Sequence, residues 1–93
     1  MTQYVSIHRA PGLSPDEMAE NALAVFNTES ATYLQNYVDL GEGFIVSVFE
    51  AANKDTLEEA FEELGFPVDE IHEVQFAQSR DELEGMLRGM GKL

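Results

Sequence analysis

The chain has 93 residues, which suits one small domain and leaves no room for two. Its 18 acidic residues far outnumber its 5 basic ones, and the formal net charge of −13 would repel the phosphates of nucleic acids and of anionic membranes. No cysteine is present, which excludes disulfides, thiolate metal sites and a cysteine nucleophile.

The sequence lacks the patterns of secretion and of membrane insertion. Its first twelve residues, MTQYVSIHRAPG, contain neither the basic nor the apolar region of a secretory signal. No apolar run approaches the roughly 20 residues that a transmembrane helix needs. We therefore expect a cytoplasmic protein without nucleic-acid or membrane partners, whose negative surface attracts cations.

Alternation and capping signals define the first half of the chain. Residues 3–8 alternate in the manner of a β-strand. Ser14 and Glu17 form the capping box of a helix whose apolar face runs to about residue 29. Two β-rich runs, at 32–40 and 43–51, are joined across a Gly-Glu-Gly turn, which is typical of a hairpin.

One more strand and two more helices are predicted in the second half. Asp55 repeats the capping pattern and begins a helix with an i, i+3, i+4, i+7 apolar stripe, which Gly65 ends. Residues 71–76 read as the fourth strand. The last helix, at 79–90, carries a stripe made of Leu83, Met86, Leu87 and Met90.

The order of these elements predicts a fold class. A β-α-β-β-α-β succession is the split-βαβ or ferredoxin-like arrangement, an α+β sandwich with an antiparallel sheet in the order 4-1-3-2. We therefore expect residues 1–93 to form a single ferredoxin-like domain, with a core at 3–76 and the extra C-terminal helix at 79–90. No linker, repeat or low-complexity stretch interrupts it.

Strand alternation then predicts which side chains share a face of the sheet. Val5 and Ile7 are expected to face the helices, and the end of the first strand should lie beside residues 71–73. The face without helices is then lined by polar and aromatic side chains: Tyr4, Ser6, His8, Gln35, Tyr37, Ser47, Phe49, Glu73 and Gln75. That composition is typical of a partner surface or a cavity wall.

His8 is the first candidate for chemistry, because imidazole acts as a base, a proton shuttle or a metal ligand near neutral pH. Glu73, on the neighbouring strand, could orient it or share a metal ion with it. An ordinary, partly exposed histidine at a strand end fits the same pattern. His72 follows an acidic pair, but alternation puts it on the face opposite Glu73, which favours a solvated histidine.

Several stretches resemble a known family. The segments APGLSPDE, NYV and VFEAANKDTLEEAFEELGFPVDEIHEV are similar to those of small ferredoxin-like proteins of largely unknown function that are grouped with a nickel-binding bacterial protein. The likeness covers residues 3 to 76 and leaves the last helix outside. The resemblance implies a homodimer and Ni²⁺ as a ligand.

The resemblance also carries over to single positions. The family pattern has the same residue types at Tyr37, Glu50 and Glu73. His8 stands where relatives often have glutamate, and either residue type can ligate a divalent ion. Ser47 occupies a position that is commonly cysteine, and Ala60 one that is commonly histidine.

Three functions remain open at this point. The first is a non-catalytic, homodimeric binding protein for a divalent metal such as nickel, with His8 and Glu73 as ligands. The second is a cofactor-free enzyme of the dimeric α/β-barrel kind, a monooxygenase or isomerase of a small organic substrate, with His8 as general base and Tyr37 positioning the substrate. The third is an interaction module that uses the methionine-rich last helix. The sequence contains no phosphate loop, HExxH or GxSxG, and we favour the binding protein.

Overall fold

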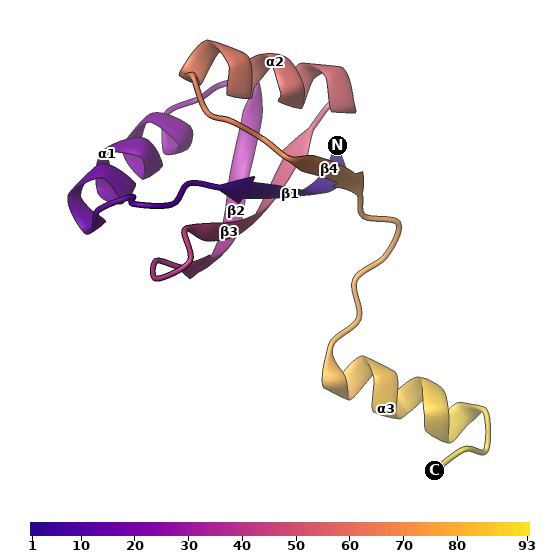
Figure 1. Ribbon diagram of the computed structural model, residues 1–93. Helices are drawn as coiled ribbons and strands as arrows, with labels where there is room; N and C mark the ends of the chain where they lie inside the picture. Colours follow the sequence, from indigo (N-terminus) through magenta and orange to yellow (C-terminus); the bar gives the residue numbers. More distant parts are fainter.

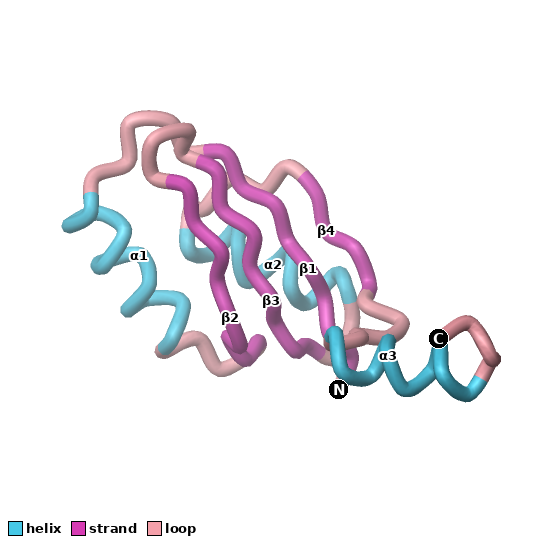
Figure 2. Tube along the Cα trace, turned by 90° about the horizontal axis from the view of Figure 1, so that it is seen from below, coloured by secondary structure: helices cyan, strands magenta, loops and turns pink.

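A four-stranded antiparallel sheet forms one of the two layers of the structure, a computed structural model that describes residues 1–93. The strands are β1 (Thr2–Arg9), β2 (Ala31–Asp39), β3 (Phe44–Ala51) and β4 (Glu70–Glu73), in the spatial order β2-β3-β1-β4. Helices α1 (Pro15–Phe26) and α2 (Lys54–Leu64) lie on one face, and the other face carries no helix (Figures 1 and 2). The predicted α+β ferredoxin-like fold and strand order are confirmed.

The capping residues explain where the helices begin and end. The Ser14 side chain accepts a hydrogen bond from the Glu17 backbone, and the Glu17 carboxylate accepts one from the Ser14 backbone N–H, which completes the predicted capping box. Helix α2 begins earlier than predicted, because Asn53 rather than Asp55 is the N-cap, accepting from the Thr56 backbone at 2.8 Å. Gly65, at a φ of 73°, ends α2 as predicted.

The hydrophobic core lies between α2 and the strands next to it. It is a cluster of seven buried side chains: Tyr4, Ala31, Phe49, Ala51, Leu57, Phe61 and Ile71. Edge-to-face ring contacts connect Tyr33 with Phe49, and Phe49 with Phe61. Helix α1 contributes no buried residue, and its Leu23 and Phe26 side chains are exposed. The core is therefore concentrated on the α2 side of the sandwich.

The predicted assignment of sheet faces is wrong for β1, β3 and β4. Tyr4, Ser6 and His8 are buried under the helices, whereas Val5 and Ile7 lie on the open face. The two faces of β1 differ less in polarity than the alternation rule assumes, and hydrogen bonds allow polar side chains to occupy the covered face.

The other strands of the sheet show the same reversal of faces, except β2, which contains a bulge. Residues paired across an antiparallel sheet share a face, so Ser47 and Phe49 on β3 are also on the helix side, as is Glu73 on β4, which is paired with Tyr4. Gln75, predicted on the open face, lies beyond the end of β4. A β-bulge between Tyr33 and Gln35 reverses the alternation of β2, with Leu34 as the extra residue. Because of the bulge, Tyr37 does lie on the open face, as predicted.

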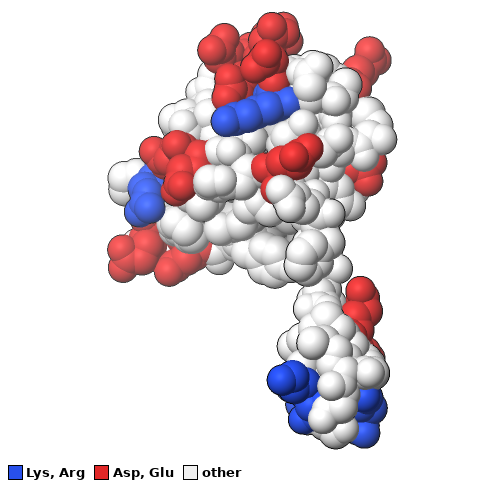
Figure 3. Space-filling model, turned by 90° about the vertical axis from the view of Figure 1, so that its right-hand side faces the viewer, with Lys and Arg blue, Asp and Glu red and all other residues white.

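Helix α3 (Arg80–Gly89) stands away from the rest of the molecule (Figures 1 and 3). Ser79 caps it as predicted, accepting from the Glu82 backbone at 3.1 Å. Strand β4 ends at Glu73 rather than at the predicted Phe76, and Phe76 is exposed in the connection to α3. None of the helices is long and apolar enough to cross a membrane.

Candidate functional site

A small, mostly apolar pocket lies between α1 and the sheet. Its volume is about 80 Å³, and ten of its fifteen lining residues are hydrophobic, among them Met18 and Val25 from α1. His8, Asn36 and Ser47 supply polar groups from three neighbouring strands. The pocket exists because α1 covers the sheet loosely, without a fully buried side chain of its own.

His8 is held on both sides of its ring. Its Nδ1–H donates to the carbonyl oxygen of Pro67 at 2.7 Å, which leaves Nε2 as the acceptor of the Ser6 hydroxyl proton at 2.8 Å. The ring also packs edge-on against Phe61, with 4.8 Å between ring centroids. Burial lowers the pKa of His8 below its usual value, against the opposing effects of the Pro67 hydrogen bond and the Asp69 charge. The side chain is therefore a neutral, fully hydrogen-bonded imidazole.

This arrangement limits what His8 can do chemically. A general base needs a ring nitrogen within reach of a substrate proton, and both nitrogens of His8 already have protein partners. The Ser6 hydroxyl resembles the nucleophile of a serine–histidine pair, but Ser6 is completely buried and no substrate could reach it. Tyr37 lies on the opposite face of the sheet from His8, so the two residues of the enzyme hypothesis do not meet.

The second polar group in the pocket is a hydrogen-bonded pair on β2 and β3. The Ser47 hydroxyl donates to Oδ1 of Asn36, to which it is directly opposed in the strand register. The Asn36 amide nitrogen has no hydrogen-bond partner in the chain and remains a donor for a ligand. Ala60 is buried on α2, beside the Phe61 that contacts His8.

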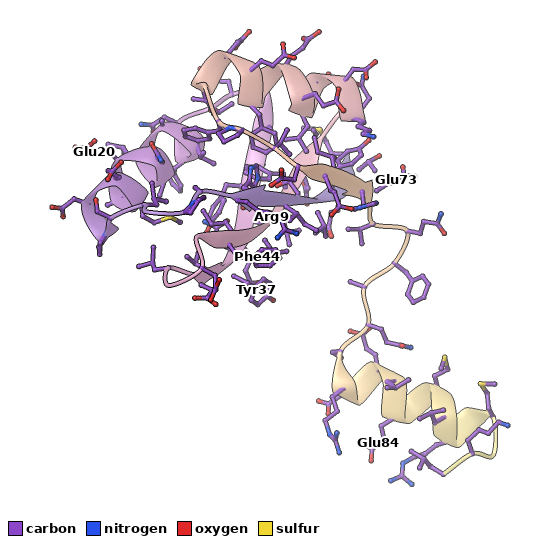
Figure 4. All side chains as sticks on the ribbon, in the orientation of Figure 1. Arg9, Glu20, Tyr37, Phe44, Glu73 and Glu84 are labelled. Atoms are coloured by element: carbon purple, nitrogen blue, oxygen red, sulfur yellow. The ribbon has the colours of Figure 1, made fainter.

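The structure does not bring His8 and Glu73 together. Glu73 is paired with Tyr4, four positions before His8 on β1, a distance of about 13 Å along a strand that rises about 3.3 Å per residue. Figure 4 shows Glu73 at the outer end of β4. The single-chain metal pair expected from the sequence is therefore not formed by these two side chains.

The pocket lacks the ligands that the divalent metal implied by the family resemblance would need. Its lining contains one imidazole, hydroxyl, amide and thioether groups, but no carboxylate and no thiolate. Nickel and similar ions favour several imidazole or charged ligands, and the two nitrogens of His8 are already occupied. The pocket does not fit a divalent metal ion.

A different set of side chains lies along the outer edge of β4. An open groove there is lined by Lys54, Glu58, Val68, Asp69, Glu70, Ile71 and His72. His72 Nε2 is 3.0 Å from Glu70 Oε1, and both side chains are more than half exposed. No three histidine or carboxylate groups of one chain are close enough to enclose an ion. Glu70 and His72 are thus a pair of adjacent, accessible metal-ligating groups rather than a complete site.

The partner of His72 is Glu70 and not the adjacent Glu73, which alternation puts on the other face of the strand. Residues i and i+2 of a strand share a face, so the Glu70–His72 spacing was the signal that could have identified the pair.

Comparisons with known proteins show the fold and the family of the chain. The chain is similar over 81% of its length to the crystal structure of SCO4226 from Streptomyces coelicolor A3(2), with 98% of that chain covered, 24% sequence identity and a TM-score of 0.72, which shows a common fold. No curated protein matches the chain. The family model described as nickel responsive protein SCO4226-like matches residues 4–74. Since this match spans most of the sequence, the chain belongs to the family of SCO4226-like nickel responsive proteins.

Proposed function

We propose that this protein is a small, non-catalytic homodimer that binds a divalent metal ion, with nickel as the first candidate. The observation that carries the proposal is the exposed Glu70–His72 pair, in which an imidazole nitrogen and a carboxylate oxygen lie 3.0 Å apart. Membership of a family described as nickel responsive supports the choice of ion. The absence of an accessible base or nucleophile in the pocket supports a binding role over a catalytic one.

The surroundings of the pair favour a cation. Glu58 and Asp69 line the same groove, and the net charge of −13 creates a field that concentrates positive ions near the surface. Glu58 is itself paired with Lys54 at 4.0 Å and Asp69 with Arg9 at 3.9 Å, so both are only partly free to move to an ion. One chain therefore supplies two ready ligands, and water or a second copy completes the coordination.

The test is a calorimetric titration of Ni²⁺ into tag-free, chelator-stripped protein. We expect saturable binding that is lost in His72→Ala and weakened in Glu70→Gln. His8→Asn is the matched control, because it removes the other histidine of the chain while an asparagine amide can still donate to the Pro67 carbonyl.

Each outcome of the titration has one meaning. Binding that survives His72→Ala but disappears in His8→Asn would return the site to His8 and contradict the groove assignment. Absence of saturable heat in the wild-type protein would refute metal binding altogether. Copper should bind more tightly than nickel at the same ligands, because affinity follows the Irving–Williams order.

The pocket between α1 and the sheet favours a second candidate function, the binding of a small, mostly apolar molecule. The free amide donor of Asn36 points to a ligand with one hydrogen-bond acceptor. A cavity volume of about 80 Å³ suits a small molecule, since pockets for drug-sized ligands have volumes of about 300–1,000 Å³. Ala22→Leu should fill the pocket from α1 and abolish shift changes caused by small ketones or amides in NMR spectra, whereas unchanged binding would refute this candidate.

A further inference from the structure

The open face of the sheet has an apolar centre that nothing in the chain covers. Val5 is paired with Val48 and Ile7 with Val46, so four β-branched side chains form a block on β1 and β3. Tyr37 extends it on β2, and Figure 4 shows Tyr37, Phe44 and Arg9 on the side of the sheet away from the helices. We refer to Val5, Ile7, Tyr37, Phe44, Val46 and Val48 as the open-face patch.

The C-terminal arm, residues 74–93, contains an apolar surface of the same kind. Leu83, Met86, Leu87 and Met90 follow one another at helical spacing along α3. None of them is buried, and Met86 and Met90 are about half exposed or more. The family match ends at residue 74, so the arm is a feature of this chain beyond the part that defines the family.

The exposed area of the chain is larger than that of a compact protein of its mass. A monomer of 10.4 kDa is expected to expose about 5,400 Å², whereas this chain exposes 6515 Å². The radius of gyration, 15.8 Å, also exceeds the roughly 12 Å of a compact chain of 93 residues. The excess of about 1,100 Å² per chain, doubled in a pair, is within the range of stable homodimer interfaces.

The charge of the C-terminal arm also complements that of the rest of the chain. Arg80, Arg88 and Lys92 are three of the five basic residues of the chain, and residues 79–93 contain as many acidic as basic groups. The whole net charge of −13 is therefore carried by residues 1–78. The rim of the open-face patch includes Asp39 and Glu50, which are paired in register with Phe44 and Gln3. An arm without net charge can approach this acidic rim without repulsion, and its basic side chains can face the carboxylates.

The dimensions of the two surfaces agree. Leu83 and Met90 are seven residues apart, which is about 10 Å along a helix. Neighbouring strands are about 5 Å apart and alternate residues about 7 Å apart, so the patch on β1, β2 and β3 is of similar size. In Figure 1 the arm extends below the level of the sheet, away from α1 and α2, and in Figure 2 it lies to one side of the open face, which is uncovered.

From these observations we infer that α3 of one chain packs on the open-face patch of a second copy, and that the exchange is reciprocal. A helix on each open face would turn the two-layer body into a three-layer sandwich that buries both apolar surfaces. The inference rests on the homodimer of the proposed function, but not on the metal. The arm reaches outward from its own sheet, which places its stripe where a second body would lie (Figures 1 and 3).

The cysteine-free chain allows a direct test by disulfide trapping. Met86→Cys in one chain and Val46→Cys in a second, differently tagged chain are mixed, allowed to exchange subunits and oxidised. We expect a covalent heterodimer. Glu84→Cys replaces Met86→Cys in the matched control, because Glu84 lies on the side of α3 away from the methionine sulfurs (Figure 4), and the cross-link should then be lost.

Other outcomes would overturn the inference in distinguishable ways. A monomer in sedimentation experiments would refute both the homodimer and the arm exchange, while the nickel titration would remain a separate result. A dimer in which Val46→Cys chains link to each other would show that two sheets pair directly, without the arm. A double variant, Met86→Cys with Val46→Cys, that closes an internal disulfide in a monomer would show the arm folding back on its own chain.

Discussion

Replacing His8 by alanine should destabilise the protein strongly, although the residue resembles an accessible strand-end histidine in the sequence. The change removes the hydrogen bonds to the Ser6 hydroxyl and the Pro67 carbonyl and the ring contact with Phe61. Ser6 is fully buried and would be left without a partner, at about 1–3 kcal/mol, and the Pro67 bond and the ring contact add about 1 kcal/mol each. We expect the free energy of unfolding to fall by about 3 kcal/mol at pH 8.

The loss of stability caused by His8→Ala should decrease as the pH falls. Burial lowers the pKa of His8 in the folded state, so the unfolded chain takes up the proton first as the pH falls below the usual value of 6.5. The wild type therefore loses stability between pH 6.5 and the lowered pKa, by at most about 1.4 kcal/mol per pH unit. His8→Ala has no histidine at this position and lacks this pH-dependent destabilisation. The difference in free energy of unfolding between the wild type and His8→Ala should therefore become smaller as the pH falls.

The measurement is urea denaturation followed by circular dichroism at several pH values and protein concentrations. His72→Ala is the control, because its side chain is exposed and its removal should change stability by less than about 0.5 kcal/mol. Equal effects of the two substitutions, or a His8→Ala difference that widens below pH 6.5, would refute the account of His8 as a neutral buried imidazole.

Two further changes test the packing of the fold by denaturation. Gly43→Ala should lower the free energy of unfolding by about 2–4 kcal/mol, because Gly43 has a φ of 65° and a Cβ there would clash with the carbonyl group of Ala10. Gly12→Ala, at a φ of 83° but in open space, should lower it by only about 1 kcal/mol, and equal losses would exclude the clash as the cause. Leu57→Ala should lower it by about 3 kcal/mol, because Leu57 is completely buried, and Leu23→Ala on the exposed side of α1 should have little effect; a small Leu57→Ala effect would contradict the assigned core.

The elements and their order could be predicted from local signals. Ser14 and Ser79 cap helices, and Gly65 ends one, by interactions among residues close in sequence. The strand order follows from the topology that these elements share with other ferredoxin-like domains. The caps and helix ends depend only on residues close in sequence, so the predicted bounds of the elements differ from those of the structure by only a few residues.

The sheet faces could not be assigned in the same way. β1 alternates Tyr4, Ser6 and His8 with Val5 and Ile7, and both sets can be buried, one by hydrogen bonds and ring contacts and the other by packing. The covered set is decided by residues far along the chain, above all Phe61 and the carbonyl of Pro67. The bulge at Leu34 also reverses which residues of β2 face the helices, and no local sequence pattern predicts it.

The positions at which this chain departs from the family pattern have one physical consequence. His8 and Ser47 line the pocket and Ala60 lies beside Phe61, so the residues implied by the resemblance, glutamate, cysteine and histidine, would bring a carboxylate, a thiol and an imidazole to this part of the fold. Here their places are taken by a neutral, doubly hydrogen-bonded imidazole, a hydroxyl held by Asn36 and a methyl group. A divalent ion bound to this protein would therefore need other ligands, and the carboxylate and imidazole at the edge of β4 are the pair that the fold leaves accessible.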